Sequence, residues 1–261
     1  MTRAGAVIAA AVIWACGSDD GPSARLSIPA TAPTRSATTG LQPLRLGGGR
    51  DGVLYVPTSY VPGEPLPLLI LLHGAGGGAS DWFGSYAQRA EDARFVMLAP
   101  DSRGVTWDAI HGRFGADVSF INAALELVAS EVAIDRTRMA LVGFSDGATY
   151  SLSLGLANGD LFTHVIAYSP GFIVSSADQG TPKFFISHGK QDPILPIART
   201  SREIVIVLRS RGYDVHYVEF DGGHEVPLDI SAQAISWLQS DWSHAAPQGT
   251  REVGSRQRTL R

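Results

Sequence analysis

The stretch "LVGFSDGATY", residues 141–150, decides the fold, because an apolar run stops there and a helical pattern begins. The break holds a polar pair, Ser145 and Asp146, flanked by Gly143 and Gly147. The spacing G-x-S-x-G is typical of a nucleophile in a tight turn between a strand and a helix, with its hydroxyl exposed above a sheet. A side chain at either glycine would collide with the neighbouring strand or helix. The pentapeptide alone is a weak indication of a catalytic serine, and the segments on both sides of it add to the evidence.

Short apolar runs recur on both sides of this stretch and alternate with amphipathic segments. The runs predicted as strands are 52–57, 66–74, 94–102, 138–145, 163–171, 182–189 and 214–222. The predicted helices are 117–132, 199–211 and 228–239. Continuous apolar strands favour a parallel sheet that is buried on both faces, and the alternation implies right-handed crossovers. The sequence therefore predicts an α/β protein with a mostly parallel central sheet and helices on both faces.

The composition is that of a globular protein with one large core, with 44% hydrophobic and 18% charged residues in a chain of 261. The formal net charge is −4, and the central region has no cluster of Lys and Arg, which argues against nucleic acid as a partner. The single cysteine, Cys16, excludes an intramolecular disulfide and a Cys-rich metal site.

The two ends of the chain differ from this core. Residues 1–15 have the layout of a lipoprotein-type signal peptide, with Arg3 followed by a short apolar stretch. "IWAC", residues 13–16, resembles a bacterial lipobox, which predicts lipidation of Cys16; an unmodified, buried cysteine is the alternative. We expect a flexible tether over 16–40, in which 24–30 fit an edge strand, and a folded domain over 41–243. A disordered basic tail is expected over 244–261, with a membrane- or polyanion-binding arm as the alternative.

Polar residues follow several of the predicted strands, at the edge of the sheet where ligands bind in such folds. After Ser145, the segment "HGKQD" brings Asp192 behind one strand, and "DGGHEVP" brings His224 behind the last one. The order Ser, acid, His matches a Ser-His-Asp triad on this kind of sheet. Ser145 would attack an acyl carbonyl, His224 would take its proton, and Asp192 would orient the imidazole. Asp221 and Asp229 stay open as alternative acids.

An acyl-transfer site also needs donors for the oxyanion. The backbone N–H groups of Asp146, at the helix start, and Ala75, in the glycine-rich "HGAGGG" turn, are the candidates. Each such donor commonly stabilises the transition state by about 3 kcal/mol.

Other chemistries fit these residues less well. The glycine-rich turn has neither the lysine of a P-loop nor a dinucleotide fingerprint, so no nucleotide cofactor is expected. Asp214 and His216 offer two metal ligands at most, so no metal site is expected either. His73 and His188 are predicted to be structural, bonding loop backbone beneath the site, and His216 to be a satisfied sheet histidine.

The chain resembles the α/β-hydrolase superfamily, and within it the phospholipase/carboxylesterase and dienelactone-hydrolase-like serine esterases. The resemblance covers about residues 41–243 and rests on "LLHGAGG", "LVGFSDG", "HGKQDPILP" and "GGHEVP" in family order. "DVSFINAALE", 117–126, is similar to the helix before the nucleophile in secreted polyester-depolymerase and feruloyl-esterase-like relatives. The resemblance implies carboxylic ester hydrolysis through an acyl-enzyme, without a cofactor. A peptidase of the same fold and a catalytically silent binding protein are the alternatives.

Two further expectations concern the substrate. The region between Ser169 and Lys183 is too short for a large cap domain, so we expect an open site for small-molecule or polymer-attached esters. The loop 102–115 supplies Trp107, His111 and Phe114 as candidate pocket walls, with plain loop packing as the alternative for the two aromatic residues. The carboxylate of Asp146 beside the oxyanion hole is a departure from many relatives. The protein is expected to be exported and either secreted or lipid-anchored to a bacterial membrane, with no other membrane contact.

Overall fold

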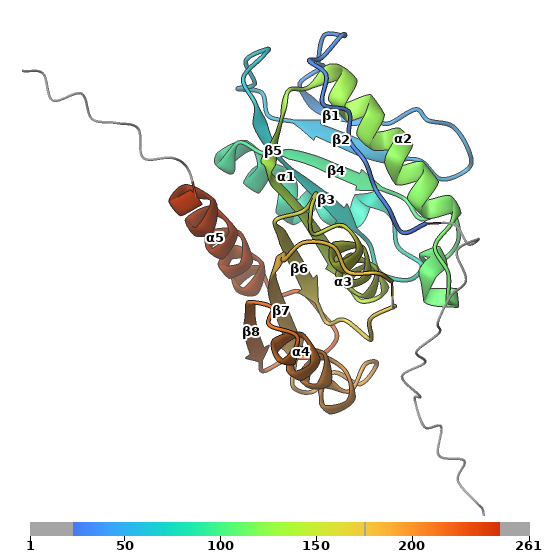
Figure 1. The fold of residues 1–261 in the computed structure, drawn as a ribbon, viewed down its shortest axis with the longest axis vertical. Helices are drawn as coiled ribbons and strands as arrows, with labels where there is room; N and C mark the ends of the chain where they lie inside the picture. The colour runs from blue at the N-terminus through green and yellow to red at the C-terminus, as the bar shows by residue number, and fades with distance from the viewer. Residues whose placement is uncertain (1–22, 175, 246–261) are drawn as a thin grey trace, which may run out of the picture.

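One sheet of eight strands runs through residues 23–174 and 176–245, the part of the chain that this computed structural model describes. The strand order is β1-β2-β4-β3-β5-β6-β7-β8 (Figure 1). The strands are β1 (Gly40–Pro43), β2 (Gly52–Val56), β3 (Leu66–Leu72), β4 (Val96–Pro100), β5 (Ile134–Phe144), β6 (His164–Tyr168), β7 (Lys183–Gly189) and β8 (Val215–Phe220). Only β1 with β2 and β2 with β4 pair antiparallel. The predicted, mostly parallel sheet is confirmed.

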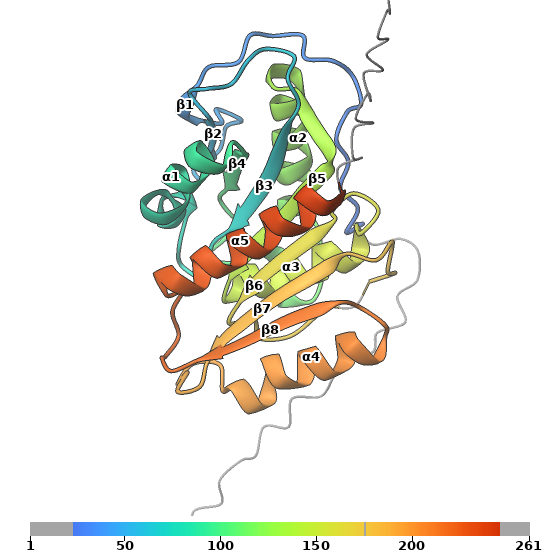
Figure 2. The same cartoon turned by 90° about the vertical axis from the view of Figure 1, so that its left-hand side faces the viewer.

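Helices cover both faces of this sheet, as predicted (Figure 2). On one face lie α1 (Phe83–Ala93) and α5 (Leu228–Ala245), and on the other lie α2 (Ala116–Glu131), α3 (Asp146–Ala157) and α4 (Ser201–Ser210). The strand β3 serves both cores, since Leu68 and Ile70 join the α2–α3–α4 side while Leu69 and Leu71 join the α1–α5 side. Each fully buried side chain of this size contributes about 1.5–3 kcal/mol, so the strand is anchored from both faces.

Two elements escape the sequence prediction. The edge strand β1 is short and only half-buried, so it has no apolar run to mark it. The helix α1 follows a 3-10 turn, Ala79–Trp82, without a side-chain cap, and ends at Arg94 in the left-handed region, where glycine is the usual signal. Two more 3-10 turns, Asp108–His111 and Ile197–Arg199, lie in loops after strands β4 and β7.

The predicted edge strand over 24–30 is wrong, although its alternating side chains Ala24, Leu26 and Ile28 are buried. Side-chain amides, not a neighbouring strand, satisfy the backbone here. Asn158 accepts from the Leu26 N–H at 2.8 Å and donates to the Ala24 carbonyl at 2.8 Å, and Asn122 accepts from the Ser27 N–H at 2.9 Å. This part of the expected tether is therefore packed against α2 and α3.

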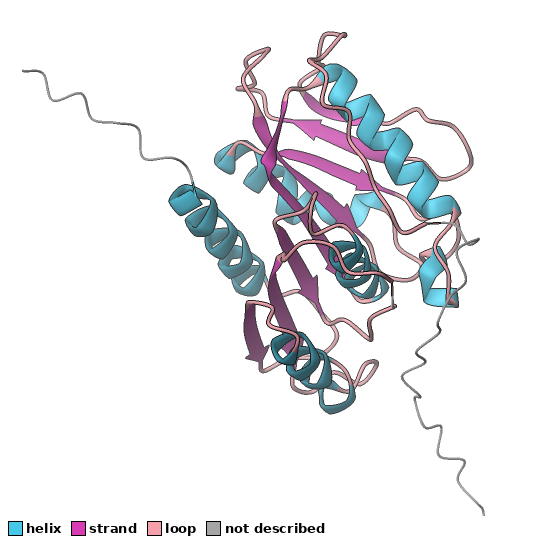
Figure 3. Ribbon diagram, viewed as in Figure 1, coloured by secondary structure: helices cyan, strands magenta, loops and turns pink. Residues whose placement is uncertain are grey.

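The carboxyl edge of the sheet is open. The connection from β6 to β7, residues 169–182, forms no helix in its described part, and Figure 3 draws it as loop. The expected absence of a large cap domain is confirmed for this connection. No helix within 23–174 and 176–245 has the length and apolar character needed to cross a bilayer. The predicted signal peptide, Cys16 and nearly all of the basic tail lie outside the described residues, and α5 extends to Ala245, past the expected tail start at 244.

Candidate active site

Ser145 lies between the last residue of β5 and the first residue of α3, with φ 56° and ψ −119°. Such a conformation costs on the order of 1–3 kcal/mol in a residue with a side chain. Glycines make the turn possible: a Cβ at Gly143 would lie 2.1 Å from the Gly147 oxygen, and one at Gly147 would lie 2.0 Å from the Leu72 oxygen. The tight contact between strand, turn and helix is therefore the physical reason for both glycines.

Ser145, His224 and Asp192 form a continuous line of hydrogen bonds. The Nε2 atom of His224 lies 2.8 Å from the Ser145 Oγ, and its Nδ1 lies 2.6 Å from the Asp192 Oδ2. The three residues come from the ends of β5, β7 and β8, which the parallel sheet brings to one edge. With the imidazole proton on Nδ1, facing Asp192, the Nε2 atom accepts from the serine hydroxyl.

Several donors hold the carboxylate of Asp192. Its Oδ1 accepts the backbone N–H groups of Ile194 and Leu195, each at 2.8 Å. Burial raises the pKa of this carboxyl, but the backbone donors and His224 outweigh burial and hold its pKa below the ordinary value. The group is therefore a carboxylate at neutral pH, able to accept from the imidazole.

The alternative acids lie elsewhere. Asp221 pairs with Lys190 at 3.0 Å and has an exposed side chain. Asp229 stands in the first turn of α5. Only Asp192 among the three contacts His224 in the described structure.

The glycine-rich turn after β3 lies directly against Ser145. A Cβ at Gly74 would lie 3.4 Å from the Ser145 Cβ. Within the described residues, the N–H groups of Ala75 and Asp146 donate to no carbonyl or side chain. Both are therefore available as donors beside the Ser145 hydroxyl.

The carboxylate of Asp146 is tied to the neighbouring loop, because its Oδ2 accepts from the Thr106 Oγ1 at 2.6 Å. Half-buried and bonded, this side chain joins the loop after β4 to the start of α3. Thr106 has no sequence signature that would have marked it for this contact.

The expected pocket walls need correction. Trp107 has 0% of its surface exposed, donates its Nε1–H to the His73 oxygen at 2.8 Å and stacks on Tyr150 at 5.1 Å. Phe114 is also buried and packs on Tyr150. Both therefore support the loop from behind, since an aromatic side chain after a strand suits the core as well as a pocket. His111 is exposed at the end of the 3-10 turn.

Three other histidines were expected to be structural. His73 and His188 are buried and bond loop backbone: His73 Nδ1 lies 2.7 Å from the Gly74 oxygen, and His188 Nε2 lies 2.8 Å from the Leu195 oxygen. His188 Nε2 also lies 3.1 Å from Asp192 Oδ2. His216 lies in β8 with an exposed side chain that stacks on Phe185 at 5.1 Å, and none of the described contacts is a hydrogen bond to its ring.

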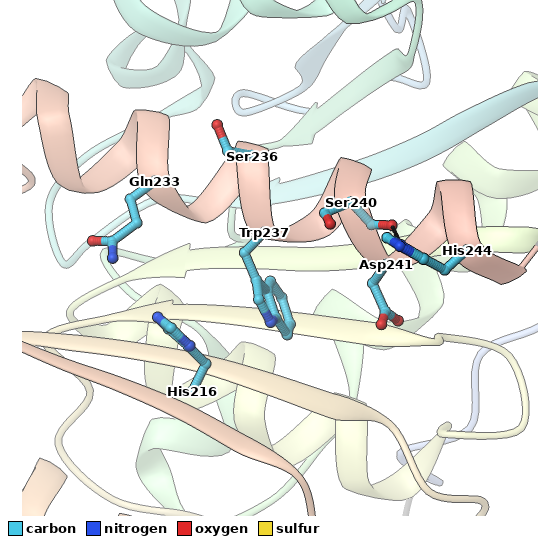
Figure 4. A pocket seen from close by; sticks show the side chains of 7 residues that line it. All are labelled: His216, Gln233, Ser236, Trp237, Ser240, Asp241 and His244. Atoms are coloured by element: carbon cyan, nitrogen blue, oxygen red, sulfur yellow. Dashed lines mark hydrogen bonds between the residues drawn. The ribbon is translucent and has the colours of Figure 1, made fainter.

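His216 borders a groove between β8 and α5, with a volume of about 560 Å³ (Figure 4). Trp237 points into this groove, and Asp241 lies farther along the helix. Asp241 already accepts from Lys183 at 2.7 Å and pairs with His164 at 2.8 Å, at the starts of β7 and β6. The groove thus lies toward the opposite end of the strands from Ser145. No group of three His, Cys, Asp or Glu side chains in the described ranges is placed to hold a metal ion.

Sequence reasoning missed one half-buried cation, Arg50, under the glycine-rich turn. Arg50 donates from Nε to the Ser102 oxygen and from Nη2 to the Gly77 oxygen, each at 2.6 Å. The loop "GGGRDG" before β2 gives no sign of these contacts, because the acceptors are backbone carbonyls far along the chain.

Comparison with known proteins gives a consistent set of relatives. The Esterase family model matches residues 45–201. Feruloyl esterase C of Emericella nidulans is 31% identical over 255 residues, which covers 88% of this chain and 91% of the fungal protein.

Solved structures of esterases share the fold. A ferulic acid esterase from Anaeromyces mucronatus, in complex with ferulic acid, has a TM-score of 0.60 and 18% identity, covering 83% of this chain and 98% of its own. Acetyl xylan esterase from Aspergillus awamori has a TM-score of 0.59 and 17% identity, covering 77% and 99%. At these identities the likeness supports the architecture and leaves the choice of substrate open.

Proposed function

The chain belongs to the esterase family of the α/β-hydrolase superfamily and is a carboxylic ester hydrolase, and from this premise we propose that it works through an acyl-enzyme on Ser145. The observation that carries the proposal is the line of hydrogen bonds from the Ser145 Oγ through His224 to Asp192. A serine hydroxyl alone is a poor nucleophile, so it needs the adjacent base.

In the proposed reaction, the Nε2 of His224 takes the hydroxyl proton as Ser145 attacks the ester carbonyl. The N–H groups of Ala75 and Asp146 bind the resulting oxyanion. The imidazolium, stabilised by Asp192, gives the proton to the leaving alkoxide, and the acyl group stays on Ser145. A water molecule, deprotonated by His224, then attacks the acyl-enzyme, and the imidazolium returns this proton to the Ser145 Oγ as the acid is released.

Labelling with a fluorophosphonate probe tests the nucleophile. We expect the wild-type protein to be labelled, and Ser145→Ala to be unlabelled and to have lost almost all esterase activity while keeping its melting temperature. Ser243→Ala, at an exposed position on α5, is the matched control and should behave as wild type. Equal labelling of wild type and Ser145→Ala, or no labelling of either, would reject Ser145.

We further propose that the substrates are esters of bulky acids attached to polymers, such as feruloyl esters. Three exposed apolar side chains stand on the loops that follow β4, β6 and β7: Val105, Phe172 and Ile194, with exposed fractions of 74%, 45% and 65%. They lie at the edge that holds Ser145, where an aromatic acyl group would cover them. The feruloyl esterase relative points to the same class of substrate.

Kinetics on matched esters test this choice. Methyl ferulate should have a kcat/KM about tenfold or more above that of methyl butyrate, because burying an aromatic ring discriminates by at least that factor. A feruloylated polysaccharide should be hydrolysed as well, since no cap covers the site. A preference for the short aliphatic ester would contradict the proposed substrate and leave the triad untouched.

Export remains a separate proposal from the sequence. Residues 1–15 act as a signal peptide in this view, and Cys16 becomes a lipidated N-terminus that tethers the enzyme to a bacterial membrane. Mass spectrometry of the mature protein would reject this proposal if Met1 were retained and Cys16 unmodified.

A further inference from the structure

The peptide group between Gly74 and Ala75 carries the proposed oxyanion donor on one side and a carbonyl on the other. In a trans peptide the C=O and N–H bonds point in opposite directions, so whatever holds the carbonyl also aims the N–H. The Gly74 oxygen accepts two hydrogen bonds, from the Gly77 N–H at 3.0 Å and from His73 Nδ1 at 2.7 Å. The direction of the Ala75 N–H is therefore fixed by the two hydrogen bonds to the Gly74 oxygen, on the other side of the same peptide group.

The proton on His73 can be assigned from its neighbours. The Ser102 N–H lies 2.9 Å from Nε2 and can only donate, so Nε2 accepts and Nδ1 carries the hydrogen. Burial, reinforced by the positive charge of Arg50, holds the pKa of His73 below its ordinary value, although the Gly74 oxygen acts in the opposite direction. The imidazole is therefore neutral, with its single N–H directed at the Gly74 oxygen.

Arg50 joins both of these supports. Its planar guanidinium donates to the oxygen of Ser102, the residue that sets the His73 tautomer, and to the oxygen of Gly77, the residue that donates to Gly74. Its Nη2 atom lies 3.3 Å from the His73 Nε2, where a positive charge disfavours a second proton. The backbone of Arg50 is held as well, because its own carbonyl accepts from the Arg103 Nη1.

We infer that Arg50 is a positioning residue for the oxyanion hole: acting through His73 and Gly77, it holds the Gly74–Ala75 peptide with its N–H toward the reacting carbonyl. This inference rests on the proposed function, since the donor matters only if an oxyanion forms at Ser145. Two hydrogen bonds to the Gly74 carbonyl also polarise the peptide and strengthen the Ala75 N–H as a donor.

Substitutions at Arg50 test the inference, with exposed Arg45 in the same loop as the matched control. Arg50→Met should lower kcat on methyl ferulate about tenfold, less than the loss of an entire oxyanion donor, with KM within about twofold. Arg50→Lys should recover only part of the rate, because one ammonium cannot reproduce the planar fork that bridges two carbonyls. Arg45→Met should match the wild type.

The affinity for an analogue of the transition state distinguishes a misdirected oxyanion donor from a general loss of structure. The affinity for a boronic acid, which forms a tetrahedral adduct on Ser145, should fall in Arg50→Met by the same factor as kcat/KM, while ferulic acid binds as in wild type. Unchanged kcat and boronate affinity in Arg50→Met would overturn the inference. A lower melting temperature of Arg50→Met, together with an equal loss of affinity for the boronic acid and for ferulic acid, would also overturn it. If Arg50→Met does not fold, the same measurements are made on Arg50→Lys. Full activity in Ser145→Ala would instead reject the proposed function itself.

Discussion

Ser145 and Ser169, at the ends of neighbouring strands, both hold positive φ angles, 56° and 51°. Each is held there by a backbone hydrogen bond, from the Ser145 N–H to the Tyr168 oxygen at 2.9 Å and from the Ser169 N–H to the Ser187 oxygen at 2.8 Å. Unfavourable backbone conformations persist only where the surrounding structure determines them. Here that structure is the parallel ladder of β5, β6 and β7, which fixes the backbone of Ser145, the proposed nucleophile, before any substrate arrives.

The proposed acid, Asp192, can be tested at the same scale. In Asp192→Asn the amide would present a donor to the imidazole and select the wrong tautomer, so we expect kcat to fall by about 10³–10⁴ with little change in KM. The matched control is Asp221→Asn, which removes the exposed partner of Lys190 and should leave kcat unchanged. Steady-state kinetics on methyl ferulate compares the two; the reverse result would assign the acid to Asp221.

At single residues, the sequence predicts those whose chemistry has a fixed place in chain order. Ser145, Asp192 and His224 each follow an apolar run, which made them candidates, and the structure places the three side chains in one line of hydrogen bonds. Arg50 could not be found in this way, because it binds backbone carbonyls that have no side-chain signature. Trp107 was misplaced for a related reason: the same residue type fits a pocket wall and a buried support.

Among the elements, the turn from β5 to α3 depends most on the absence of a side chain. We expect Gly147→Ala to lose about 3 kcal/mol or more of unfolding free energy, because its Cβ would overlap the backbone of β3 at Leu72. Gly84→Ala in α1 is the matched control: a Cβ there meets nothing within 4 Å, so stability should stay the same or rise by up to about 1 kcal/mol. Urea unfolding measures both. Equal stability of the two variants would contradict the packing argument.

The helices and strands found from the sequence are those whose pattern is set by burial. The strand β3 is apolar throughout because both of its faces are covered, and this pattern has few alternatives. In β5 the residues 135–137, which follow Ile134, are polar and partly or fully exposed, so the predicted strand begins at 138 whereas the observed one begins at Ile134. The patterns therefore predict the buried centre of an element better than its ends.

Across the whole molecule, the arrangement of strands was predictable and the path of the N-terminal segment was not. Alternating helices and strands allow few sheet topologies, so the α/β class followed from the pattern. The segment 24–30 has the alternation of a strand, but its partners are Asn158 and Asn122, amides distant in sequence. A local pattern predicts which side chains are buried, but it does not identify the hydrogen-bond partners of the backbone N–H and C=O groups between them.

Asn158, which binds the backbone of Ala24 and Leu26, places this N-terminal segment at the end of α3 opposite Ser145. Asn158 caps the far end of α3, the helix that Ser145 begins, about 18 Å along its axis. In Figure 2 the first and last described residues both lie on the side away from the arrow tips of β3, β6 and β7. An enzyme immobilised through residues next to either end of the described chain would present the edge of the sheet that holds Ser145 away from its support.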